Sequence, residues 1–108
     1  MSHYEDGVAA YKKHDDAAAV SGFRNAVEED PKNFRAAVYL ALSLERMGDL
    51  DSAASAARMA LEASPDYAKG HNALGNISRS QGKLDEALHC YKTATRLEPG
   101  SSLYRHNL

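Results

Sequence analysis

Proline occurs three times in the chain, at Pro31, Pro65 and Pro99, and both intervals between them are 34 residues. Each proline closes a segment of similar pattern: AVEEDP, ALEASP and ATRLEP. A fixed period of this length is typical of one supersecondary unit that is copied along the chain. Stacked copies present a long curved surface and seldom a catalytic pocket. The period therefore constrains both the architecture and the class of function.

Residues that are 34 positions apart resemble one another well beyond proline. Small residues and turn glycines recur in the columns Ala19/Ala53/Ala87, Ala26/Ala60/Ala94, Gly7/Ala41/Gly75 and Gly48/Gly82. A further column holds larger residues, Phe23 and Tyr91, with Ala57 between them. Within one copy, the small and apolar residues follow the i, i+3, i+4 spacing of one helix face. We therefore expect each copy to be a helical hairpin whose small residues let the two helices approach closely.

The breaks between these helices carry recognisable signals. Gly48 can adopt the left-handed conformation that ends a helix, and Asp49 or Asp51 can cap the helix that follows. Proline ends the second helix of each copy because it restrains the preceding residue away from the helical region. The predicted helices span about 2–13, 17–29, 34–47, 51–63, 67–81 and 84–97, and a seventh segment begins after Pro99.

These columns carry a resemblance to a known family, and the copy HNALGNISRSQGKLDEALHCYKTATRLEP shows it most clearly. Its Leu-Gly pair, aromatic residues, repeated alanines and closing proline resemble the tetratricopeptide repeat pattern over the whole chain. The resemblance implies an all-α fold, an α-solenoid of three helical hairpins plus a partial fourth repeat helix. It divides a single domain, 1–108, into repeats at about 1–33, 34–67 and 68–101, with 102–108 as the start of a fourth unit or a truncated capping helix.

Several residues of the first copy depart from the family pattern, and among them His3, Asp6 and Ala10 leave its first helix short of apolar residues. His14 replaces the turn glycine of the first copy, and Gly22 lies in the middle of a predicted helix. A glycine in a helix interior costs about 1 kcal/mol relative to alanine. These departures weaken the first helix without changing the fold that the pattern predicts.

Composition places limits on partners and compartment. The 108 residues are enough for one domain, and 26% of them are charged with a formal net charge of only −2. This balance gives no reason to expect nucleic acid or an anionic membrane as a partner. No apolar run is long enough to span a bilayer, and a single cysteine, Cys90, fits a reducing compartment. We therefore expect a cytoplasmic protein without nucleic-acid or membrane partners.

The sequence offers no arrangement typical of catalysis. The five histidines lack a histidine or cysteine partner at i+3 or i+4, so no metal site is predicted. His89 and Cys90 are adjacent on a helix and point in different directions, and no third residue orients them. No glycine-rich loop suited to phosphate is present. We expect no catalytic, metal or cofactor site, and hence a protein that is not an enzyme.

What remains is a binding surface. In the family that the chain resembles, the first helix of each hairpin lines a concave groove that binds peptides or protein segments. Counting out these positions predicts nine groove residues: Tyr4, Tyr11, Arg35, Tyr39, Leu42, Lys69, Asn72, Asn76 and Arg79. The tyrosines and the leucine would bury apolar side chains, and the amide and basic side chains would orient a backbone or an acidic group. The alternative is that these residues are simply exposed positions of a scaffold.

Some members of the family clamp the terminal carboxylate of heat-shock-protein tails with lysines, asparagines and an arginine. Here those roles would fall on Tyr4, Val8, Tyr39, Lys69 and Ala73. Only Lys69 matches in type, so the sequence does not predict this form of recognition.

Two alternatives to a stand-alone interaction module remain open. The chain can be the substrate-recognition arm of a larger enzyme, or it can be a scaffold that self-associates. The last predicted helix lacks a polar capping helix, which solenoids need for solubility, so its C-terminal edge could stack on another copy.

Overall fold

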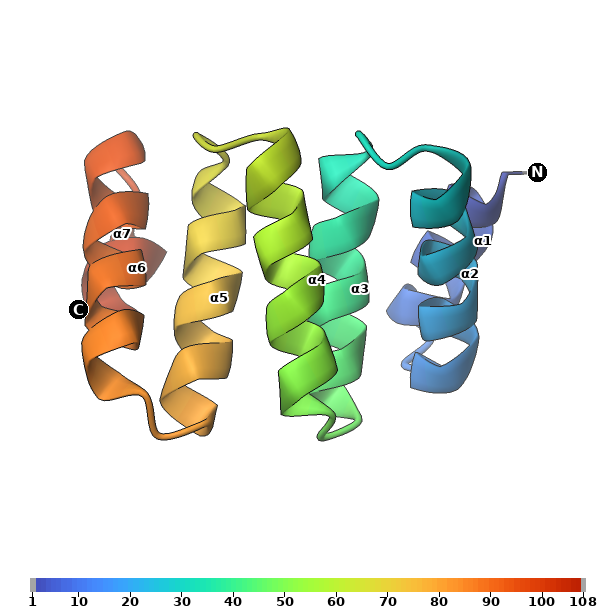
Figure 1. Cartoon of the computed structure of the whole chain (residues 1–108), viewed down its shortest axis with the longest axis horizontal. Helices are drawn as coiled ribbons and strands as arrows, with labels where there is room; N and C mark the ends of the chain where they lie inside the picture. The colour runs from blue at the N-terminus through green and yellow to red at the C-terminus, as the bar shows by residue number, and fades with distance from the viewer. Residues whose placement is uncertain (1, 108) are drawn as a thin grey trace.

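The computed structural model describes residues 2–107, and within that range it contains seven α-helices and no strand. The helices are α1 (His3–Lys12), α2 (Asp16–Glu29), α3 (Phe34–Arg46), α4 (Leu50–Ala63), α5 (Ala68–Ser80), α6 (Leu84–Leu97) and α7 (Ser102–Asn107). Figure 1 shows them side by side along the long axis, as three antiparallel hairpins followed by α7. The predicted all-α solenoid is confirmed, and the bounds of the six predicted helices differ from the observed ones by at most one residue.

Side chains cap the first four helices. The acceptors are Ser2 for α1, Asp15 for α2, Asn33 for α3 and Asp49 for α4. Asp49, and not the alternative Asp51, is therefore the cap that follows Gly48, and its Oδ1 accepts from Ser52 N at 3.4 Å. The third hairpin differs, because Tyr67 and Lys83 stand at the same positions and neither makes a capping hydrogen bond.

The turn inside each hairpin needs one residue in the left-handed region. Gly48 and Gly82 supply it with φ angles of 82° and 80°. His14 occupies the same place in the first hairpin with a φ of 60°, where a side chain is strained. The structure thus bears out the expectation that His14 replaces a turn glycine.

Relief of this strain is our first prediction. Changing His14 to glycine is expected to stabilise the protein by about 0.5–1 kcal/mol, since the left-handed penalty exceeds the entropy that glycine adds to the unfolded chain. Urea unfolding at matched pH measures the difference. Lys13→Gly is the matched control, because Lys13 has a φ of −86° and gains nothing from glycine. Equal effects of the two changes would contradict the prediction.

Each outer hairpin pairs a glycine with an aromatic ring. A Cβ atom on Gly75 would lie 2.6 Å from the Tyr91 ring, and one on Gly7 would lie 2.7 Å from the Phe23 ring. In the middle hairpin, Ala41 stands in place of the glycine and Ala57 stands in place of the aromatic residue, and both are fully buried. The hairpins therefore close by two different combinations of small and large residues.

Gly22 has a packing role that its position in the helix does not reveal. It is buried, and a Cβ atom there would lie 2.8 Å from the backbone of Gly7. The two glycines let the backbones of α1 and α2 touch. Gly22 is therefore required by tertiary packing, in addition to the helix-propensity cost that the sequence predicts.

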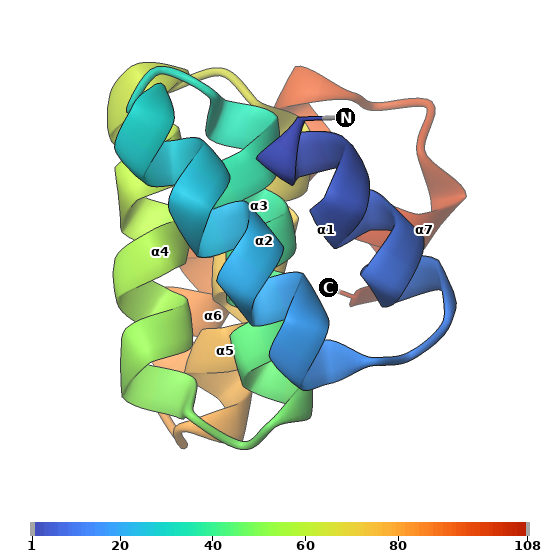
Figure 2. The same ribbon diagram turned by 90° about the vertical axis from the view of Figure 1, so that its right-hand side faces the viewer.

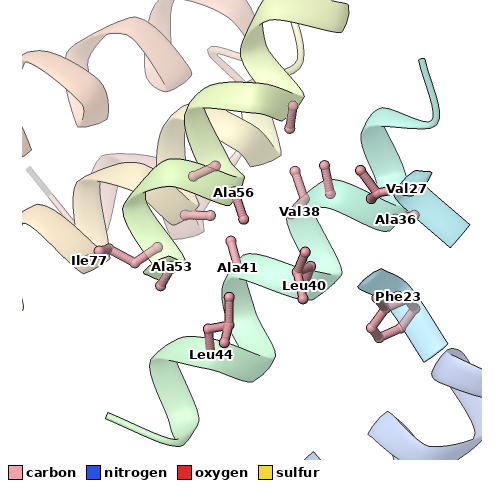
Figure 3. Packing of buried hydrophobic residues seen from close by; sticks show 14 of the residues in the cluster. Phe23, Val27, Ala36, Val38, Leu40, Ala41, Leu44, Ala53, Ala56 and Ile77 are labelled. Atoms are coloured by element: carbon pink, nitrogen blue, oxygen red, sulfur yellow. The ribbon is translucent and has the colours of Figure 1, made fainter. Parts of the chain in front are cut away.

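The core follows the stack and is made mostly of alanine. Phe23 and Ile77 are its largest completely buried apolar side chains. In Figure 3, α3 lies between α2, which carries Phe23, and α4, which carries Ala53 and Ala56. Small side chains keep neighbouring helices close along the whole array.

The odd-numbered helices form one side of the stack. Helix α3 contacts both α1 and α5 directly, whereas no comparable contact joins α2 to α4 or α4 to α6 within residues 2–107. In the end-on view of Figure 2, α4 lies on the left and α1 and α7 lie on the right. Because neighbouring odd-numbered helices are closer together, they line the inner side of the curve, where the family resemblance places the groove.

Candidate functional site

A cavity of about 240 Å³ opens on this inner side, between α3, α5 and α7. Its lining comes from three successive units of the stack, plus the residue that precedes α5. The lining residues are Arg35, Val38, Tyr39, Leu42, Tyr67, Lys69, Asn72, Ala73, Leu103 and Tyr104.

The floor of the cavity is apolar. Val38 and Ala73 are buried, Leu42 is half-buried, and Leu103 is 59% exposed at the margin. Burying one large apolar side chain against such a surface is worth about 1.5–3 kcal/mol. The space is suited to one such side chain from a partner.

The charged residues of the lining are both cations, Arg35 and Lys69. The ion pairs that join residues 2–107 are His3–Glu29, Arg46–Asp16 and Arg58–Glu86, and neither cation takes part in them. Burial raises the pKa of the Tyr67 phenol, and the positive charge of Arg35 opposes that rise. The lining therefore carries two cations and no carboxylate, while the Glu98 carboxylate, outside the lining, acts on both Tyr67 and Tyr104.

Helix α7 forms one wall of the cavity. Its Tyr104 is only 4% exposed and packs with Ala68 of α5 and Ala94 of α6, and this burial raises the pKa of the phenol. The side-chain amide of Asn107 donates to Oδ1 of Asn72 at 2.7 Å. These two contacts attach α7 to α5 and α6 and hold Leu103 at the cavity margin.

The nine predicted groove residues divide between this cavity and its surroundings. The cavity lining includes five of them: Arg35, Tyr39, Leu42, Lys69 and Asn72. Tyr4, Tyr11, Asn76 and Arg79 lie outside it and contact other side chains of the same chain. Asn72 itself presents an oxygen that is already hydrogen-bonded, so its amide nitrogen is the group left for a ligand.

The tyrosines of α1 belong to an aromatic cluster. The ring of Tyr39 stacks on Phe23 at 5.0 Å with an interplanar angle of 8°, and Tyr11 meets Tyr39 edge-on at 5.2 Å. Tyr4 lies 6.3 Å from Tyr39, and burial raises the pKa of its phenol. The guanidinium of Arg46 lies over the Tyr11 ring, 3.9 Å from its centre. The rings of the cluster thus pack against Tyr39, which also lines the cavity.

Asn76 and Arg79 lie nearer the end of α5. Oδ1 of Asn76 accepts a 2.6 Å hydrogen bond from the Tyr91 hydroxyl, and Arg79 lies 5.8 Å from the centre of the same ring. This contact leaves the amide nitrogen of Asn76 as the group that can meet a peptide carbonyl. Both residues are outside the cavity lining.

Two lining tyrosines are not among the predicted site residues. Tyr67 stands 34 residues after Asn33, at the N-cap of α5, where a tyrosine cannot cap. Tyr104 stands in the column of Ala36 and Gly70, which are both small and buried. An aromatic residue that breaks the pattern of its column is the available signal in both cases.

Chemistry elsewhere in the chain is limited. Cys90 is 4% exposed, and burial, aided by the Glu86 charge, raises the pKa of its thiol to about 11 while Arg58 opposes the rise. His89 is exposed beside it. Among residues 2–107, no group of three or more histidine, cysteine or acidic side chains is placed to hold a metal ion. Over the same range, no helix has the length and apolar character needed to cross a membrane.

The state of Cys90 gives our second prediction. Its thiol should react with a disulfide reagent at least about a hundredfold more slowly in the folded protein than in urea, because a pKa near 11 leaves very little thiolate at neutral pH. The rate should increase as the pH rises toward 11. A Cys90→Ala chain with Ser55→Cys on the exposed face of α4 is the control and should label rapidly. Rapid labelling of native Cys90 would contradict the prediction.

Comparisons with known proteins agree on one family. A family model described as a tetratricopeptide repeat matches residues 4–68, and another of the same description matches residues 68–101. The small glutamine-rich tetratricopeptide repeat-containing protein 2 of Mycosarcoma maydis is 26% identical over 106 residues, which are 95% of this chain and 29% of that protein. The chain therefore spans less than a third of this relative's length.

Solved structures agree with the fold. The first TPR of Spaghetti (RPAP3) bound to the HSP90 peptide SRMEEVD has a TM-score of 0.94 at 23% identity, covering 98% of this chain and 84% of that one. The second TPR domain of human RPAP3, in complex with the HSP70 peptide SGPTIEEVD, has a TM-score of 0.94 at 21% identity, covering 99% and 89%. At these identities the likeness establishes the fold alone.

Proposed function

The chain belongs to the tetratricopeptide repeat family, and from that premise we propose that it is a non-catalytic interaction module that binds a segment of a partner protein on its inner side. The observation that carries this proposal is the cavity between α3, α5 and α7, which has an apolar floor and a rim of cations, tyrosines and an amide. Solved relatives of the same fold hold peptides, which supports a peptide as the class of ligand.

The mode of binding should differ from that of those relatives. At the positions expected to clamp a terminal carboxylate, this chain has aromatic or apolar residues except at Lys69. Tyr39 and Ala73 instead line the cavity. We infer that insertion of an apolar side chain replaces terminal-carboxylate recognition as the main source of affinity.

A selection from a random-peptide display library tests the proposal, because such a library samples many ligands at once. Peptides recovered on the native chain are then titrated against Leu42→Gln/Leu103→Gln, which makes the cavity polar. We expect affinity to fall at least tenfold, because the buried apolar contact is lost. The matched control is Leu84→Gln/Leu88→Gln, which changes two exposed leucines on α6 and should leave affinity unchanged. Circular dichroism verifies that both variants are folded.

Two results would reject the proposal. One is a set of selected peptides that bind both variants as well as the native chain. The other is a set whose binding depends on the α6 leucines and not on the cavity.

Self-association is a second candidate function, which the exposed leucines of α6 favour. Leu88 is 41% exposed, whereas Val20 and Ala54, in the same column, are 8% and 1% exposed under the next unit of the stack. Leu84 is 65% exposed one turn earlier. Sedimentation across a concentration series should then show association that Leu84→Gln/Leu88→Gln removes. A strict monomer at high concentration would reject this candidate.

A further inference from the structure

The cavity lining has a charge that differs from that of the whole chain. Acidic residues outnumber basic ones in the sequence, 15 to 13, yet the lining contains Arg35 and Lys69 and no carboxylate. Glu45, near the end of α3, lies outside the lining and is partly buried. This burial raises the pKa of its carboxyl group, and the positive charge of Arg79 on α5 opposes the rise. A ligand that enters this cavity therefore meets two cations beside an apolar floor, and the nearby Glu98 carboxylate lies outside the lining.

The two cations occupy equivalent places in successive units. Arg35 and Lys69 are 34 residues apart and lie in the first turns of α3 and α5, which contact each other directly. Because different helices carry the two cations, each can pair with its own carboxylate on a ligand.

The alternation of side chains along an extended peptide determines which of its residues can reach these cations. Successive side chains of an extended peptide point to opposite sides, so a side chain shares its side with those two residues away. A carboxylate beside the apolar side chain in the cavity must therefore lie two positions before or after it. Peptide carbonyls can meet the side-chain amide of Asn72, whose oxygen is bonded to Asn107.

We propose that the cavity binds an interior acidic segment of a partner protein, in which an apolar side chain enters between α3 and α5 and carboxylates two residues away pair with Arg35 and Lys69. This inference rests on the proposed function and specifies its ligand. The apolar side chain supplies most of the affinity, because exposed ion pairs contribute little each. The carboxylates supply selectivity and a dependence on salt.

A set of synthetic peptides tests the ligand. The probe is fluorescein-Gly-Ser-Glu-Ser-Leu-Ser-Glu-Ser-Gly with an amidated carboxyl end. A second peptide has glutamine in place of both glutamates, a third has alanine in place of leucine, and a fourth ends at leucine with a free carboxylate. Binding is measured by fluorescence anisotropy and by NMR titration up to millimolar peptide.

The glutamate peptide should bind about tenfold more tightly than the glutamine peptide at low salt, and the difference should shrink at high salt. Arg35→Gln/Lys69→Gln should remove the difference and leave the glutamine peptide unaffected. Arg24→Gln/Lys92→Gln makes the same change in net charge at exposed positions outside the cavity lining and should preserve the difference.

The possible outcomes distinguish a failure of this inference from a failure of the proposed function. Equal binding of the glutamate and glutamine peptides, with a loss for the alanine peptide and for Leu42→Gln/Leu103→Gln, overturns the acidic ligand and keeps the binding site. Tightest binding of the free-carboxylate peptide also overturns it, in favour of a chain terminus. Absence of binding by all four peptides overturns the acidic ligand, and the proposed function then stands or falls with the display-selected peptides and their dependence on Leu42 and Leu103.

Discussion

Replacing Gly22 with valine is expected to destabilise the protein by about 3 kcal/mol, and replacing it with alanine by about 1 kcal/mol. Helix propensity alone predicts the opposite for alanine, a gain of about 1 kcal/mol. Packing outweighs this gain because the new Cβ atom would lie 2.8 Å from the backbone of Gly7 and 3.1 Å from the carbonyl of His3. Backbone atoms cannot rotate away as a side chain can, so α1 and α2 must separate.

Urea unfolding measures the loss, and hydrogen exchange shows where it occurs. Amides of α1 should lose protection first, since α1 is the helix displaced by the added side chain. Ser21→Ala is the matched control, because Ser21 is exposed on the same helix and should be neutral or slightly stabilising. A Gly22→Ala protein that is more stable than the native one would show that the backbones of α1 and α2 are not in contact.

The pair of Gly7 and Phe23 should behave as one unit in a double-mutant cycle. Phe23→Ala is expected to cost about 3–5 kcal/mol, because the ring is completely buried and stacks on Tyr39. Gly7→Ala alone should cost about 1–2 kcal/mol through its clash with that ring. The double mutant should be more stable than the sum predicts by about 1–2 kcal/mol, because the new methyl group occupies space that the ring has vacated.

The middle hairpin already has the combination of residues that the double mutant would create. Ala41 and Ala57 occupy the same two columns and are both fully buried. Stability is measured by urea unfolding of the four proteins of the cycle. Leu88→Ala, which changes an exposed residue on α6, should add independently to either single change. Strict additivity of Gly7→Ala and Phe23→Ala would show that the two side chains do not share one space.

Much of the fold could be predicted because the signals for helices, turns and helix ends recur from copy to copy of the repeat. Gly48 and Gly82 place the turns, and the proline columns place the ends of the second helices, so the helix bounds follow within one residue. The role of Gly22 could not be predicted in this way. It depends on the distance between two backbones, and the equivalent residues, Ala56 and Cys90, both carry a Cβ atom, so the repeat gives no sign that a glycine is needed there.

The site was less accessible to sequence reasoning. Helix periodicity indicates which residues face the inner side, but it does not reveal which side chains are already engaged with one another. Asn76 is bonded to Tyr91, and Tyr11 lies under Arg46. Both contacts join different helices and depend on rotamers. Tyr67 precedes α5, so the periodicity of the first helices does not include it.

Tyr67 also marks a helix end that lacks a stabilising side-chain cap. The equivalent Asn33 caps α3 with a 3.1 Å hydrogen bond, whereas α5 begins without a side-chain cap. A missing cap costs about 1 kcal/mol, and at this place the side chain forms part of the cavity wall instead. We therefore expect the first turn of α5, which carries Lys69, to open more easily than the capped first turn of α3 and to adjust to the shape of a bound segment.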